Sequence, residues 1–183
     1  MRLSFLLTIL IAAGCLSKED ALQPRYFHPR LPAPDAGAVA DPGRPVRFGR
    51  VSAAPYLEAR VVWRVSKHEI GFDENHRWAA PPDLMAQDAL GGLAERGGIH
   101  RSEASDAADL EIHVAAFEVD LGAGQALVRI RASLRDSMSR ETRYRTFEAR
   151  HDADAKDMES VAQGMGEALQ EVVEAIAAWV RQG

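Results

Sequence analysis

The strongest constraint on the fold is an apolar stripe near the C-terminus. Seven apolar side chains follow one another in steps of three or four residues: Met158, Val161, Met165, Leu169, Val172, Ile176 and Trp179. Steps of three and four are the spacing of one face of an α-helix. A helix with so continuous an apolar face must pack against a second surface. The sequence therefore predicts a layered fold with a long C-terminal helix.

The second surface is predicted to be a β-sheet. Residues 46–51, 60–65, 110–114 and 128–134 alternate or are rich in β-branched residues, 143–150 is a weaker example, and 68–72 forms the return arm of a hairpin after 60–65. Phe117 and Val119 continue the run 110–114 on the opposite parity. We therefore expect a bulge near Ala115 and Ala116 that keeps one face buried.

A shorter helix is predicted between these strands. Pro81, Pro82 and Asp83 are typical of a helix start, apolar residues then recur at helical steps up to Leu93, and Gly97 with Gly98 ends the segment. The order of elements predicts an α+β domain. We expect an antiparallel sheet packed on one face by two helices, the longer one C-terminal.

The N-terminus has the pattern of a secretory signal. Arg2 precedes a short apolar run, and small residues lead up to Cys15, which is the only cysteine of the chain. This arrangement resembles the lipobox of bacterial lipoproteins. The resemblance implies a signal peptide at 1–14 and a mature chain whose Cys15 carries a diacylglycerol and an N-acyl chain such as palmitate. The alternative is a plain secreted protein with an incidental cysteine.

Residues 15–44 are predicted to form a tether between the lipidated cysteine and an α+β domain at 45–183. The segment has no sustained period and is rich in proline: Pro24, Pro29, Pro32, Pro34 and Pro42. Tyr26 and Phe27 stand out within it. They are either an edge strand laid on the domain or stray aromatics in a linker.

Composition and motifs exclude several functions. Lys and Arg number 22 against 27 Asp and Glu, and the net charge of −5 gives no bulk attraction to nucleic acid. The six histidines have no metal-ligand spacing, and no Gly-x-Ser-x-Gly motif occurs. The sequence thus predicts a protein that is not an enzyme and needs no metal or other cofactor.

The feature with most chemical content is a set of arginines in the last two predicted strands. Arg129, Arg131 and Arg135 share one strand face, and Arg143 and Arg145 follow in the next strand. Antiparallel pairing would gather guanidinium groups that bind phosphate headgroups or an acidic partner. The alternative is a solvated outer face in which these arginines form ion pairs with Glu111, Glu118 and Glu148.

Short motifs resemble the ABC-type transport auxiliary lipoprotein family. They are Pro55-Tyr56-Leu57, Arg60-Val61-Val62-Trp63-Arg64, Ile70-Gly71-Phe72 and Arg77-Trp78-Ala79. The resemblance covers most of the chain from Tyr26 to Trp179. Family members are typically outer-membrane lipoproteins that partner MCE-domain proteins, which form tunnels carrying lipid between the two membranes.

For this chain the resemblance implies a non-catalytic lipoprotein at the periplasmic face of the outer membrane, where it docks the lipid-conducting tunnel. Contact residues would be Tyr56, Trp78 and the arginines at 129, 131, 143 and 145. An exposed sheet edge would allow a homo-oligomeric ring, although no residue demands one. The alternative function is that of an assembly factor or pilot for an outer-membrane β-barrel or secretin.

Overall fold

The computed structural model describes residues 23–31 and 44–182. The predicted signal peptide and Cys15 lie outside these ranges. The described elements, in chain order, are β1 (Arg25–Phe27), β2 (Val46–Ala53), β3 (Arg60–Ser66), β4 (Glu69–Trp78), α1 (Pro82–Glu95), β5 (Ala108–Asp120), β6 (Gln125–Arg135), β7 (Thr142–Asp152) and α2 (Met158–Arg181).

The strands form one seven-stranded sheet in the order β1-β4-β3-β5-β6-β7, with β2 also paired to β5. The predicted α+β class is confirmed, and the longer helix is the C-terminal one. The predicted antiparallel sheet is wrong for three pairings, because β1 with β4, β2 with β5 and β3 with β5 run parallel. Alternation in a sequence reports which side chains are buried, but it does not report strand direction.

The bulge predicted in the central strand is confirmed. The register of β5 with β6 shifts between Val114 and Ala116. Leu110, Ile112 and Val114 are buried before the shift, and Phe117 and Val119 are buried after it. The extra residue therefore keeps all five side chains on the core side of one long strand.

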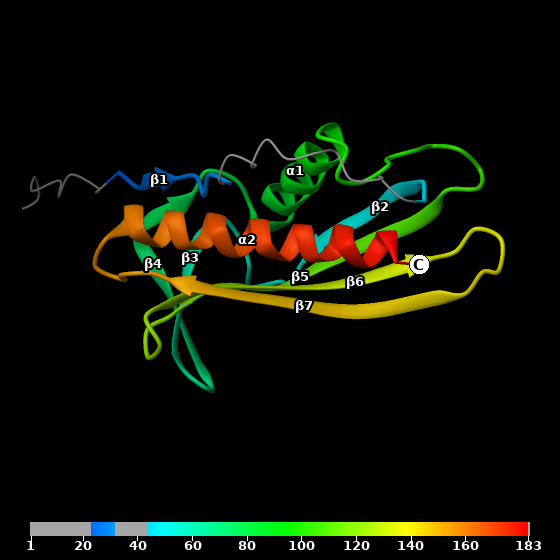
Figure 1. Ribbon diagram of the computed structural model, residues 1–183. Coiled ribbons are helices and arrows are strands. Elements are labelled where there is room, and N and C mark those ends of the chain that lie inside the picture. Colours follow the sequence, from blue (N-terminus) through cyan, green and yellow to red (C-terminus); the bar gives the residue numbers. More distant parts are fainter. Residues whose placement is uncertain (1–22, 32–43, 183) are drawn as a thin grey trace, which may run out of the picture.

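The two helices form a layer over the sheet, as Figure 1 shows. Helix α2 packs along β6 and β7, α1 packs on β2 and β5, and the helices contact each other. The Asp157 side chain caps α2 by accepting a hydrogen bond from the Glu159 backbone N–H at 3.0 Å. Helix α1 is terminated by Gly97, whose φ of 78° is the left-handed conformation that favours glycine.

The aromatic pair before the domain is part of the folded body. Strand β1 runs parallel to β4, and Phe27 is buried. The chain then crosses α2 so closely that a Cβ atom on Gly166 would lie 2.2 Å from the Arg30 carbonyl oxygen. Of the two interpretations of Tyr26 and Phe27, the edge strand is therefore confirmed. The rest of the predicted tether, apart from residues 23–31 and 44, lies outside the described residues.

Candidate functional site

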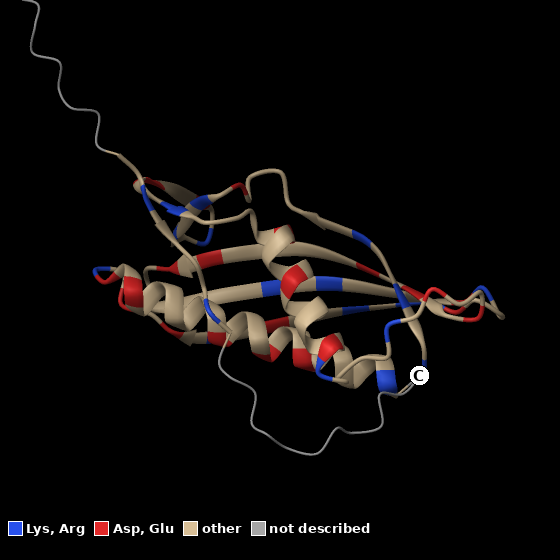
Figure 2. Ribbon diagram, turned by 90° about the horizontal axis from the view of Figure 1, so that it is seen from above, with Lys and Arg blue, Asp and Glu red and all other residues tan. Residues whose placement is uncertain are grey.

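The candidate site is the face of the sheet turned away from α1 and α2, which we call the outer face. It is defined by side chains that the strand registers place side by side on β2, β5, β6 and β7: Ser52, His113, Arg131 and Thr146 form one such row. Paired residues of adjacent strands point to the same side of a sheet. Figure 2 shows the opposite, helical side, where acidic residues follow α2.

One end of the outer face is closed by an ion-pair network around Asp109. Arg47 donates to one carboxylate oxygen at 2.7 Å, and Arg135 donates to the other at 2.9 Å. The hydrogen bond from Arg135, reinforced by Arg47 against the opposing effect of burial, lowers the pKa of Asp109. This carboxylate is therefore committed to its two partners.

A second network occupies β6 and β7 toward the other end. Arg129 donates to Glu148 at 2.6 Å, Arg150 donates to the second Glu148 oxygen at 3.0 Å, and Arg150 also lies 3.7 Å from Asp120. Burial would raise the pKa of Glu148, but the hydrogen bonds from both arginines outweigh it and the pKa is lowered. Arg129, a predicted contact residue, is thus held in an ion pair.

Beside this network lies a buried ion pair between β3 and β5. The Glu118 side chain is 3% exposed, and Arg64 donates to its two oxygens at 3.0 and 2.8 Å. Such two-pronged pairing satisfies both oxygens of a buried carboxylate. The pair therefore fixes β3 to the part of β5 that follows the bulge.

Tyr56, another predicted contact residue, is half-buried next to the same pair. Its hydroxyl donates to the Ala115 carbonyl at 3.1 Å, so the ring ties the segment between β2 and β3 to the bulge. Burial raises the pKa of Tyr56, and the charge of Glu118 acts in the same direction while Arg64 and Arg129 oppose it. The hydroxyl of Tyr56 is therefore already engaged by the backbone at the bulge.

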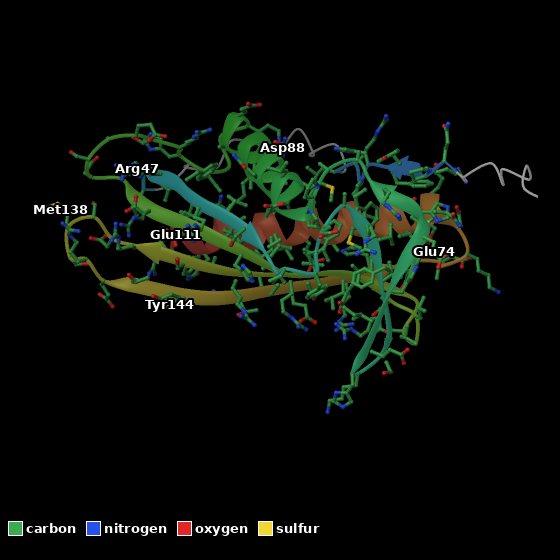
Figure 3. All side chains as sticks on the ribbon, turned by 180° about the vertical axis from the view of Figure 1, so that it is seen from behind. Arg47, Glu74, Asp88, Glu111, Met138 and Tyr144 are labelled. Carbon is green, nitrogen blue, oxygen red and sulfur yellow. The ribbon has the colours of Figure 1, made fainter. Side chains whose placement is uncertain are left out.

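Between the two networks the outer face has a shallow hollow of about 190 Å³. Its lining includes Arg50, Glu111, His113, Arg131 and Tyr144. Within the described ranges, Arg50, Arg131 and Glu111 form no ion pair. The charged groups are thus paired at both ends of the face and unpaired in its centre. Figure 3 labels Glu111 and Tyr144 on the sheet, with Met138 at the turn beyond them.

Strand pairing was expected to gather several arginines on one face, and this expectation is wrong for Arg143 and Arg145. The register pairs them with Leu134 and Ala132, which are buried under the helices, so they lie on the face opposite to Arg131. The Arg143 guanidinium stands 5.4 Å from the Trp179 ring centroid, and that of Arg145 stands 5.3 Å from the ring of Phe147. These two arginines border the contact of β7 with α2.

Trp78 is a core residue and not an exposed contact residue as predicted. Its side chain is 1% exposed, and its ring meets Phe117 edge to face with centroids 5.5 Å apart. It ends β4 directly before the helix start, where the prolines turn the chain over the sheet. A ring buried in this way has no surface to offer a partner.

The prediction missed the residues that line the hollow on β2, β5 and β7. Their signal was present in the alternation: Glu111 and His113 take the polar parity of β5, and Tyr144 takes the polar parity of β7. The strand register, which places Ser52, His113 and Arg131 in one row, could not be predicted from the alternation. Arg50 was missed because it sits in a register irregularity of β2.

The described residues contain neither a cluster of metal ligands nor a membrane-spanning helix. No group of three or more His, Cys, Asp or Glu side chains within 23–31 and 44–182 is arranged to hold a metal ion. In the same part of the chain, no helix has both the length and the apolar character needed to span a bilayer.

The comparisons with known proteins decide the family. The sequence matches the family model described as the ABC-type transport auxiliary lipoprotein component over residues 30–177. The chain belongs to the ABC-type transport auxiliary lipoprotein family. The predicted resemblance is therefore confirmed, and membership in this auxiliary lipoprotein family associates the chain with an ABC transport system.

Solved structures show that the fold of this auxiliary lipoprotein is shared. A crystal structure of a Xanthomonas campestris protein of the DUF330 family is 21% identical with a TM-score of 0.74, covering 86% of this chain and 95% of that chain. A crystal structure of an uncharacterized protein is 16% identical with a TM-score of 0.62, covering 87% and 97%. No curated protein matches the sequence.

Proposed function

We propose that the protein is a non-catalytic periplasmic lipoprotein, anchored in the outer membrane through acyl chains on Cys15. In this role it docks the distal end of a lipid-conducting tunnel formed by an MCE-domain protein of an ABC transport system. The observation that carries the proposal is the family match over residues 30–177. The lipobox-like sequence before Cys15 supports the anchor.

The position of β1 supports a close attachment to the membrane. Because β1 begins at Arg25, only ten residue steps separate Cys15 from the folded body. Ten residues span at most about 33–36 Å when fully extended. The domain would therefore be confined to a thin layer next to the bilayer, not released on a tether of nearly thirty residues.

Confinement of this kind favours docking. A short link raises the effective concentration of the domain at its partner, because binding no longer requires diffusion through the whole periplasm. Two buried acyl chains would be sufficient for stable anchoring, since each buried CH₂ contributes about 0.8 kcal/mol. The outer face, which neither helix covers, is a surface that remains available to a partner or to its cargo.

The test is purification of the tagged, lipidated chain from crosslinked cells, with a Cys15→Ser variant as the matched control. We expect an MCE-domain protein to be captured with the wild type and to be strongly reduced with Cys15→Ser, because the variant is no longer confined. Capture of only a β-barrel or secretin would favour the assembly-factor alternative. Capture of neither class would contradict both functions.

A further inference from the structure

The hollow in the centre of the outer face has the charges of a binding site for a zwitterionic ligand. Two guanidinium groups, Arg50 and Arg131, and one carboxylate, Glu111, border it and form no ion pair with each other or with any residue of 23–31 and 44–182. Every other arginine named on this face has an acidic partner. Unpaired charges of both signs in one hollow are the complement of a ligand that carries both signs.

The side chains of the central row suit the anionic part of such a ligand. Arg131 lies between His113 on β5 and Thr146 on β7. The Nδ1 atom of His113 forms a hydrogen bond with the Ser52 hydroxyl at 3.1 Å, so its Nε2 atom is left to bind a ligand. A guanidinium fork, an imidazole nitrogen and hydroxyl groups are the partners that phosphate oxygens take in proteins.

The adjacent row suits the cationic part. Glu111, Ser133 and Tyr144 are side by side on β5, β6 and β7, and the Tyr144 side chain is 79% exposed. A carboxylate and an aromatic ring together bind ammonium groups. Neighbouring rows on one sheet face are about 7 Å apart, a separation that long arginine and glutamate side chains close further. The cationic subsite is thus next to the phosphate subsite.

We propose that this hollow binds the headgroup of a phosphatidylethanolamine-type lipid, with the phosphate on Arg50 and Arg131 and the ammonium on Glu111 and Tyr144. The volume of about 190 Å³ fits a headgroup and is below the range of 300–1,000 Å³ typical of sites for larger ligands. That the headgroup belongs to a lipid rests on the proposed transport function. The charge complementarity rests on the outer face alone.

The experiment is a titration of the mature chain carrying Cys15→Ser, observed by NMR, with two water-soluble headgroups. Glycerophosphoethanolamine carries phosphate and ammonium, whereas glycerophosphoglycerol carries phosphate only. We expect the wild type to bind the first more tightly, with shifts in the amides of β5, β6 and β7. The absence of binding, or equal binding of the two compounds, would overturn the proposal.

Two variants separate the two subsites, and a third serves as their control. Arg131→Gln should weaken the binding of both headgroups about tenfold, which corresponds to about 1.4 kcal/mol, because the phosphate loses a charge-assisted hydrogen bond. Glu111→Gln should remove the preference for ethanolamine and leave the binding of glycerophosphoglycerol no weaker. Arg96→Gln, at the end of α1 on the other side of the sheet, should match the wild type. Retained preference in Glu111→Gln, or equal weakening by Arg96→Gln, would refute the assignment.

The result is independent of partner capture. Headgroup binding without capture of an MCE-domain protein would contradict the proposed docking while leaving the site in place. Capture of that partner by a protein that binds neither headgroup would contradict the site alone.

Discussion

The buried ion pair between Arg64 and Glu118 leads to a quantitative prediction about stability. Glu118→Gln keeps the size of the side chain but leaves the Arg64 guanidinium without its anion. Removing one partner of a buried pair costs about 3–5 kcal/mol. The Arg64 side chain is 25% exposed, so water recovers part of that loss. We therefore expect the variant to lose about 3 kcal/mol of unfolding free energy.

The assay is urea or thermal unfolding of the mature chain with Cys15→Ser as background. A loss of about 3 kcal/mol corresponds to a melting temperature lower by about 6–12 °C for a chain of this size. Glu103→Gln is the matched control: this side chain is 71% exposed and meets Arg47 and Arg101 only at 3.6 and 4.0 Å. The control should change stability by less than about 0.5 kcal/mol.

A double-mutant cycle tests the same reasoning. Arg64→Met with Glu118→Leu replaces both charges by apolar groups, and the pair of substitutions should cost less than the sum of the two single ones. Additive losses, or a Glu118→Gln variant as stable as Glu103→Gln, would show that the pair does not hold β3 to β5.

Three further predictions concern other parts of the fold. Gly166→Ala should displace the segment around Arg30, because the new Cβ would lie 2.2 Å from the Arg30 carbonyl oxygen. Limited trypsin digestion should then cleave after Arg25 and Arg30 faster than in the wild type. Gly91→Ala is the control and should not change the cleavage rate, because no atom lies within 4 Å of the added Cβ. Trp78→Ala should cost about 3–5 kcal/mol in chemical denaturation, whereas Tyr144→Ala should leave stability within about 0.5 kcal/mol, and equal losses would contradict their opposite burial. The contribution of Asp109 and Glu148 to the free energy of unfolding should be complete above about pH 5 and should fall as the pH drops, because their pKa values are lowered in the folded state while the unfolded chain takes up protons near the ordinary pKa of about 4. Asp109→Asn should flatten part of this fall, and an unchanged pH profile would contradict the network.

The burial pattern of the sheet was accessible from the sequence because alternation is a local property. The opposite parities of Val114 and Phe117 were enough to predict the bulge that the register confirms. Periodicity likewise predicted α2, because an apolar stripe with steps of three and four from Met158 to Trp179 is the pattern of one helix face. Local chemistry also predicted the end of α1 at Gly97.

Strand direction and the faces of β7 required tertiary information. β2 reaches β5 in parallel only after the chain has formed β3, β4 and α1, and nothing within β2 encodes that path. The arginines of β7 could have been assigned correctly from one signal. Phe147 and Ala149 share the parity of Arg143 and Arg145, so this parity faces the helices.

In the candidate site, too, local patterns could be predicted from the sequence, whereas contacts between strands could not. Arg131 was identified from the sequence because it follows the polar parity of β6. The pairing state of each arginine depends on the residues that β5 and β7 place beside it. Arg129 is paired with Glu148, whereas Arg131 has no acidic partner within the described ranges. A list of arginines could not distinguish a neutralised position from a free one.

The most direct test of the proposed role is the chemical state and location of the N-terminus. Intact-mass and peptide mass spectrometry of the protein from separated membranes should find a chain that begins at Cys15, carries a diacylglycerol and an N-acyl chain, and fractionates with the outer membrane. A chain that retains residues 1–14 or an unmodified Cys15 thiol and stays in the soluble fraction would contradict an outer-membrane transport lipoprotein.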